Sequence, residues 1–293
     1  MAFATTSDGI RLFYESAGRG TPIVFVHEFG GNHWSWEPQV GYFSRRHRCI
    51  TFSARGYLPS DVPEDVERYS QARAADDIID VMNAAGIETA HIVGLSMGAF
   101  ACLHAALRYP GRIRSAVIAG AGYGSEREHQ EFFRRNSEQV ARAFEERGAR
   151  AFAPVYGESA SRVQFQEKDP RGWQLFVDRM AQHSDKGAAN TMRGVQMRRP
   201  SLYDLEAALA ALQVPLLVVA GDEDDHSIQP SIFLKRTAPR SGLAVFPKSG
   251  HTLNLEEPAL FNHLLAEFIA QVEAGRWGAR DPRADPTQIM RAE

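Results

Sequence analysis

The sequence predicts an α/β fold, with a mostly parallel central sheet flanked by helices and a helical cap insertion. Short β-rich runs alternate with helical patterns through the first half of the chain, as expected of parallel strands joined by helices. Several of these runs are apolar throughout, which is typical of strands covered on both faces. The alternation stops between about Ser125 and Glu206, where the sequence is polar, arginine-rich and helical in period, and it resumes at Val214.

The individual elements follow from this pattern in chain order. Helices are expected at 70–86, between Ser70 as the N-cap and Gly86 as the stop, and at 97–111 and 258–275. The core should therefore comprise residues 1–124 and 206–274, the helical insertion residues 125–205, and a proline-punctuated tail, mobile or resting on a partner, residues 275–293. Strands are expected at residues 10–16, 22–28, 48–54, 90–96, 115–120, 215–221 and 242–248.

Composition narrows the class of protein. With 293 residues, 44% of them apolar, and a net charge of −3, the chain is an ordinary globular protein without the basic face that nucleic acids require. Cys49 and Cys102 are too few for a disulfide framework and should be core residues. The N-terminus lacks a secretory signal, and no apolar run approaches the roughly 18 to 20 residues that span a bilayer. We therefore expect a soluble cytoplasmic protein, either a monomer or a homodimer.

One pentapeptide points to nucleophilic chemistry. Gly94 to Gly98 reads G-x-S-x-G and stands between a predicted strand and a predicted helix. A turn this sharp strains the central Ser96 and leaves no room for side chains two residues to either side, which the two glycines satisfy. Ser96 would then project at a helix N-terminus, where the helix dipole favours developing negative charge.

A serine nucleophile requires a base and an acid, and the chain offers both downstream. The predicted strand 215–221 is followed by acidic residues, among which Asp222, Asp224 and Asp225 are candidates. His251 lies in a glycine-containing loop after the last predicted strand. All three groups follow the carboxyl ends of predicted strands, where open parallel sheets bind their ligands.

With these motifs the chain resembles the α/β-hydrolase fold superfamily, and within it the serine esterases, over nearly all of residues 1–275. The resemblance implies that Ser96 is the nucleophile, His251 the general base, and Asp224, in its Gly-Asp-x-Asp turn, the acid. It also implies an oxyanion hole formed by the backbone N–H groups of Met97 and Phe29.

Glu28 departs from the family pattern, because relatives usually have glycine at this position. Three hypotheses follow: the side chain turns away and pairs with an arginine such as Arg55, it contacts substrate, or it is protonated beside the oxyanion. An ionised carboxylate within about 4 Å of the oxyanion would oppose the charge that the hole stabilises. Glu28 is therefore compatible with catalysis only if it is turned away or neutralised.

The predicted reaction is the hydrolysis of a small carboxylic ester through an acyl-enzyme, without a metal or an organic cofactor. A lactonase, a hydrolase of carbon–carbon bonds in ring-cleavage products, and a hydrolase-like small-molecule sensor are the alternatives. Besides Glu28, the candidate substrate contacts are His33, Trp34, Trp173, His183 and Tyr203.

Overall fold

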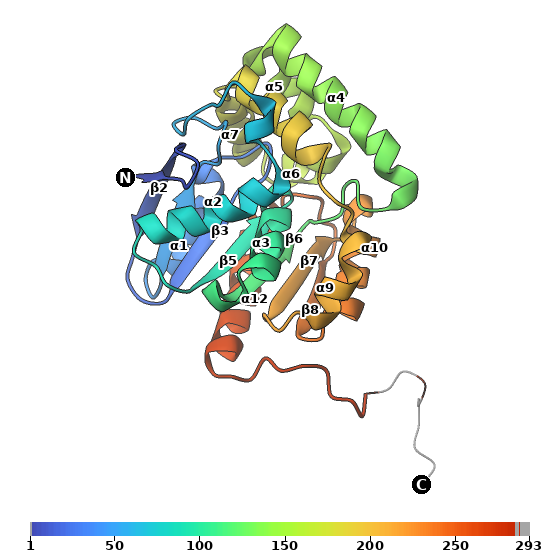
Figure 1. Ribbon diagram of the computed structural model, residues 1–293. Coiled ribbons are helices and arrows are strands. Elements are labelled where there is room, and N and C mark those ends of the chain that lie inside the picture. Colours follow the sequence, from blue (N-terminus) through green and yellow to red (C-terminus); the bar gives the residue numbers. More distant parts are fainter. Residues whose placement is uncertain (1, 285–286, 288–293) are drawn as a thin grey trace.

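The computed structural model describes residues 2–284 and 287, and its centre is a single eight-stranded sheet (Figure 1). The strand order is β1-β2-β4-β3-β5-β6-β7-β8; β1 and β2 pair antiparallel, β2 and β4 pair antiparallel, and all other neighbours are parallel. This confirms the predicted α/β class with a mostly parallel sheet. The strands are β1 (Ala2–Thr5), β2 (Arg11–Ala17), β3 (Pro22–Val26), β4 (Arg48–Phe52), β5 (Ala90–Leu95), β6 (Ile113–Ala119), β7 (Leu216–Gly221) and β8 (Ser241–Phe246).

Both faces of the sheet are covered by helices, because successive side chains of each buried strand point to opposite faces. In β3, Val24 and Val26 belong to the apolar cluster on the face covered by α2, α3 and α10, whereas Ile23 and Phe25 belong to the cluster on the face covered by α1 and α12. The apolar runs seen in the sequence are therefore central strands buried on both sides. The flanking helices are α1 (Glu37–Phe43), α2 (Gln71–Ala84), α3 (Met97–Arg108), α9 (Glu206–Ala211), α10 (Asp225–Thr237), α11 (Leu253–Glu256) and α12 (Pro258–Glu273), with short turns η1 (His33–Trp36), η2 (Val66–Arg68), η3 (Pro110–Arg112) and η7 (Leu202–Leu205).

Some elements were not predicted from the sequence. Strand β1 has four residues, too few to show a clear alternation, and helix α10 contains Pro230, which usually marks a helix end. Cys49 in β4 and Cys102 in α3 are free and buried, as predicted.

Most of the segment between β6 and β7, before η7 and α9, is built from helices that gather at one end of the sheet (Figure 1). We call residues 127–196 the helical layer. It has an apolar core of its own, which includes Phe144, Phe165 and Met180 and which also takes in Phe29 and Met97 from the sheet side. The helical layer comprises η4 (Arg127–His129), α4 (Gln130–Arg147), α5 (Ala149–Gly157), η5 (Ala160–Arg162), α6 (Val163–Lys168), α7 (Pro170–Met180), α8 (Asp185–Thr191) and the π-helical turn η6 (Met192–Gln196).

The start of the predicted C-terminal tail is attached to the core rather than free. The Trp277 ring lies 4.6 Å from the Phe268 ring, centroid to centroid, and its indole N–H donates to the Arg240 carbonyl at 3.0 Å. Within the rest of the predicted tail, residues 285–286 and 288–293 lie outside the described residues. Within the described residues, none of the helices has the length and apolar character needed to span a membrane.

Candidate active site

Ser96 occupies a strained turn between β5 and α3. Its φ of 54° lies in the left-handed region, which is unusual for a residue with a side chain. The turn is held by the Ser96 N–H, which donates to the Ala119 carbonyl at 2.8 Å. A Cβ at Gly94 would overlap the Gly98 carbonyl, and a Cβ at Gly98 would overlap the Val26 carbonyl, so both positions require glycine. The pentapeptide thus forms the turn that its sequence predicts.

His251 and Asp224 lie side by side beyond the ends of β8 and β7. The Nδ1 atom of His251 is 2.8 Å from Oδ2 of Asp224, and both side chains are at least 95% buried. The other candidate acids lie elsewhere, because Asp222 accepts from the Ser249 N–H at 3.1 Å and Asp225 is exposed. Among the three aspartates, the structure brings only Asp224 to His251.

Asp224 has a second partner that the sequence did not indicate. The Tyr123 hydroxyl, just after β6, donates to Oδ1 of Asp224 at 2.9 Å. Burial alone would raise the pKa of Asp224, but the neighbouring His251 and the hydrogen bonds from His251 and Tyr123 lower it below its usual range. An ionised Asp224 fixes the His251 ring with Nδ1 as the donor, which leaves Nε2 to act as a base.

Ser96 and His251 share the wall of one cavity of about 400 Å³ between the sheet and the helical layer. Among the described residues, the Ser96 hydroxyl has no hydrogen-bond partner, so it is free to meet a molecule in the cavity. The apolar and aromatic part of the wall comes largely from α4 and α5. The polar part of the wall includes Tyr123, His129, Asn136, Gln196, Arg199 and His226.

The loop after β3 is held by its histidine. The Ala54 N–H donates to Nε2 of His27 at 3.0 Å, so Nδ1 carries the proton and donates to the Glu28 carbonyl at 2.6 Å. Burial lowers the pKa of His27 to about 4, which keeps the ring neutral. Phe29, the next residue, lines the cavity, and Met97 is the first residue of α3, so its N–H has no intrahelical acceptor.

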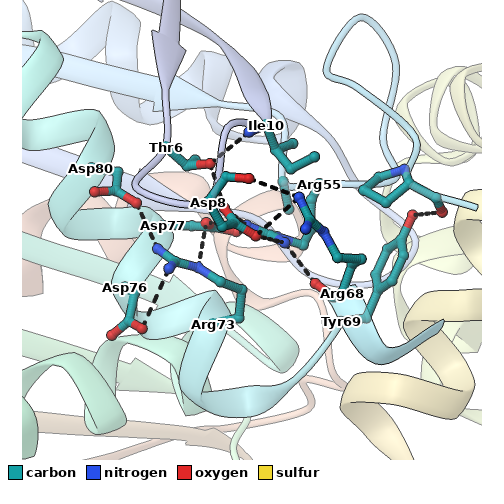
Figure 2. Close-up of polar contacts among 12 residues, drawn as sticks. Thr6, Asp8, Ile10, Arg55, Arg68, Tyr69, Arg73, Asp76, Asp77 and Asp80 are labelled. Carbon is teal, nitrogen blue, oxygen red and sulfur yellow. Dashed lines mark hydrogen bonds and ion pairs between the residues drawn. The ribbon is translucent and has the colours of Figure 1, made fainter. Parts of the chain in front are cut away.

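Glu28 does not line the cavity and forms a buried ion pair with Arg162 of the helical layer. Its side chain is 2% exposed and that of Arg162 is 1% exposed. The hypothesis that Glu28 turns away and pairs with an arginine therefore agrees with the structure, but the choice of Arg55 was wrong. Figure 2 shows Arg55 held instead by Asp77 and Asp8, at 2.7 Å and 3.0 Å.

The other predicted substrate contacts lie outside the cavity, as Glu28 does, each for a local reason. His33 is buried and bonds the Ser53 hydroxyl at 2.8 Å. Trp34 lies on the surface, and the guanidinium carbon of Arg179 is 5.0 Å from the centre of its indole ring. These side chains serve packing rather than the cavity wall.

The remaining predicted contacts are held in the same way. The Trp173 indole N–H donates to the Gly157 carbonyl at 2.7 Å. The His183 ring is buried against Tyr57 at 5.1 Å, and the Tyr203 ring stacks on Phe233 at 4.4 Å. These residues were predicted to contact substrate because they belong to the helical insertion, but in the structure they pack against the partners just named.

Several wall residues were missed by the sequence analysis. Tyr123 and His226 each follow the carboxyl end of a parallel strand, so the rule that located Asp224 could have found them. Arg199, between η6 and η7, gives no such signal because its position depends on how the helical layer folds back. No cluster of three or more metal-ligating side chains is present among the described residues.

The sheet topology, the strained serine turn and the adjoining histidine–aspartate pair are together those of an α/β-hydrolase. Residues 21–258 match the model of the alpha/beta hydrolase fold family, and the chain belongs to this family. It is 31% identical over 277 residues to the AB hydrolase superfamily protein YisY of Bacillus subtilis, covering 91% of this chain and 98% of that protein.

Two further comparisons give activities of similar proteins. The chain is 25% identical over 255 residues to 3-oxoadipate enol-lactonase 1 of Acinetobacter baylyi, covering 86% of this chain and 89% of that protein. A thermophilic esterase from Thermogutta terrifontis superposes with a TM-score of 0.81 at 25% identity, covering 92% of this chain and 98% of that structure. These relatives are hydrolases, and the chain is an enzyme of the α/β-hydrolase class.

Proposed function

We propose that the protein is a serine hydrolase that cleaves a small carboxylic ester through an acyl-enzyme. One observation carries the proposal: a strained Ser96 with a free hydroxyl shares a cavity with His251, whose ring is fixed by Asp224. A serine with a free hydroxyl in an apolar cavity has no evident structural purpose at a backbone position that costs about 1–3 kcal/mol.

In the first half of the reaction, the Ser96 oxygen attacks the ester carbonyl while His251 Nε2 accepts the hydroxyl proton. A tetrahedral oxyanion forms. The bond to the alcohol oxygen then breaks, His251 returns the proton to that oxygen, and the alcohol leaves an acyl group on Ser96. In the second half, His251 accepts a proton from water, whose oxygen attacks the acyl carbon. The bond to the Ser96 oxygen then breaks, His251 returns the proton to that oxygen, and the carboxylic acid leaves.

The N–H groups of Met97 and Phe29 are the proposed donors to the oxyanion, each worth about 3 kcal/mol of transition-state stabilisation. Phe29 follows Glu28 directly, which raises the question of like-charge repulsion. Because Arg162 neutralises the Glu28 carboxylate and both are buried outside the cavity, the pair presents no net negative charge to the oxyanion.

A lactone is the second candidate substrate, since a lactone is a cyclic ester and requires the same groups. The enol-lactonase among the relatives favours it. The two candidates differ in one step: the alcohol of an opened lactone stays tethered to the acyl group until water releases both.

The test is labelling with a fluorophosphonate probe together with turnover of short-chain aryl esters and lactones. We expect labelling and turnover in the native chain, and in Ser96→Ala no labelling and a loss of kcat of about 10⁴-fold or more. The matched control is Ser16→Ala, on the exposed side of β2, which should behave as the native chain does. Binding of ester without turnover in the native chain would contradict the proposal and favour a hydrolase-like sensor.

A further inference from the structure

Arg199 lies on the wall of the cavity that contains Ser96 and His251. Its side chain is buried, with the residue 8% exposed, and its guanidinium carbon is 3.8 Å from the centre of the Phe100 ring and 4.8 Å from that of Phe133. Phe100 is one helical turn after Ser96 in α3, and its N–H donates to the Ser96 carbonyl at 3.1 Å. The guanidinium therefore lies against a side chain of the first helical turn after Ser96, and Arg199 and Ser96 line the same cavity.

The charge of Arg199 is not balanced within the described part of the chain. Its guanidinium donates to the Gln196 side-chain oxygen at 2.5 Å and to the Tyr123 carbonyl, both of which are neutral acceptors. It forms no ion pair with any described carboxylate, and its Nε is buried without a partner. Burial lowers the pKa of Arg199 to about 9, so the group still carries its charge at neutral pH.

The rest of the cavity also favours an anion. In the described part of the chain the wall contains no aspartate or glutamate that could neutralise Arg199. Asp224, which does not line the cavity, is occupied by His251 and Tyr123. Inside a largely apolar cavity, an unbalanced positive charge attracts an anion more strongly than it would in water.

We propose that Arg199 binds a carboxylate group of the substrate, so that the site prefers esters that carry a free carboxylate in addition to the scissile bond. This inference rests on the proposed function, because it assigns the substrate class of the same site. A planar guanidinium suits a carboxylate because it offers five N–H donors in a fixed fork, of which the bonds to Gln196 and Tyr123 use two.

A purely structural role for Arg199 makes a different prediction. If Arg199 only ties η6 to the loop at Tyr123, its removal disturbs the cavity for every substrate alike. If it binds a carboxylate, its removal acts on anionic substrates selectively and mainly through KM. The discriminating quantity is therefore the ratio of kcat/KM between two esters that differ only in charge.

Two such pairs probe the two sides of the ester. For the alcohol side, 4-carboxyphenyl acetate is compared with 4-carbamoylphenyl acetate. For the acyl side, the mono-4-nitrophenyl ester of adipate is compared with the 4-nitrophenyl ester of adipamic acid, where an uncharged amide replaces the free carboxylate. We expect the native chain to prefer the carboxylate in at least one pair by about 10-fold to 100-fold, as one hydrogen-bonded charge pair provides.

In Arg199→Met this preference should fall to about one, and Arg199→Lys, which keeps the charge but not the fork, should retain part of it. The control is Arg198→Met, which removes the same charge from the neighbouring residue, a half-exposed partner of Glu67 at 2.7 Å outside the cavity. Arg198→Met should keep the native preference. A native chain without preference in either pair, or an Arg199→Met variant in which both esters of a pair lose activity equally, would overturn the inference.

The binding of adipate separates this inference from the proposed function. By calorimetry, the native chain should bind adipate about 10-fold or more tightly than adipamide, and Arg199→Met should lose that difference. Neutral esters hydrolysed without any carboxylate preference would leave the serine hydrolase in place and remove only the role of Arg199. Selective binding of adipate without ester turnover would support the role of Arg199 and contradict the proposed hydrolase activity. If Arg199→Met does not fold, the native selectivity and Arg199→Lys decide the question.

Discussion

Two buried arginines, Arg199 on the cavity wall and Arg162 outside it, have opposite surroundings. Both lie in the chain between β6 and β7, and both guanidinium groups rest on two aromatic rings. Arg162 has Glu28 as a buried counter-ion, and although burial lowers its pKa, Glu28 raises it above the usual range. Arg199 has no counter-ion among the described residues, and burial lowers its pKa.

The difference indicates what each charge is for. A buried cation that is neutralised inside the protein can position the chain but offers little to a ligand, and Arg162 ties the helical layer to the loop that carries Phe29. A buried cation without a counter-ion costs free energy in the folded state, and that cost is expected where a ligand later supplies the charge.

The largest expected effect is on the paired arginine. Arg162→Met leaves the Glu28 carboxylate buried without a partner, and breaking a buried ion pair in this way should lower the free energy of unfolding by about 3–5 kcal/mol. Urea denaturation measures this directly. Ester turnover should fall as well, because the uncompensated carboxylate is adjacent to Phe29, a proposed oxyanion donor.

The double variant Arg162→Met/Glu28→Gln distinguishes the charge from the packing. Because it removes both charges, it should recover most of the stability and turnover that Arg162→Met alone loses. Arg171→Met, at an exposed position of α7, is the control for arginine loss in the same layer. Additive effects of the two single changes would mean that Glu28 and Arg162 do not act as a pair.

The same comparison explains which parts of the site could be predicted from the sequence. The serine turn could be predicted because its signature lies within five residues, although the clash that requires Gly98 comes from the Val26 carbonyl. His251 and Asp224 could be predicted because parallel strands bring their carboxyl ends together. The partner of Glu28 could not be predicted, because Arg162 is 134 residues away in the sequence. Arg55 was an equally plausible partner, and only the structure shows that Asp77 and Asp8 bind it. Arg199 could not be predicted as a wall residue either, because its position also depends on contacts between distant parts of the chain.

A buried histidine, unlike the two buried arginines, can avoid the cost of a buried charge by remaining neutral. This predicts that the free energy of unfolding depends on pH. Burial lowers the pKa of His183 from 6.5 to about 3, and both of its ring nitrogens are buried without partners. Below pH 6.5, His183 therefore binds a proton in the unfolded chain but stays neutral in the folded chain. The free energy of unfolding should fall as the pH falls, by about 2 kcal/mol between pH 7 and pH 5 for this one histidine.

Urea denaturation of His183→Phe across this pH range is the measurement. The variant should be about as stable as the native chain at pH 7, because no hydrogen bond of the ring is lost, and it should lose about 2 kcal/mol less on going to pH 5. His263→Phe, at an exposed position of α12, should leave the pH dependence as it is. If the pH dependence of the free energy of unfolding is the same in His183→Phe as in the native chain, then His183 is protonated in the folded state. It would then be a buried charge, as Arg162 is.

The smallest expected effect on stability is at Arg199, and it sharpens the comparison most. Arg199→Met loses two hydrogen bonds to neutral acceptors but also removes an unbalanced buried charge, so the free energy of unfolding should change by no more than about 1 kcal/mol. Adipate at 100 times its Kd should then stabilise the native chain by about 2.7 kcal/mol and the variant hardly at all. A loss as large as that in Arg162→Met would make Arg199 a structural residue like its counterpart. A small loss without ligand, together with a large difference with ligand, is the pattern that only a charge reserved for the substrate produces.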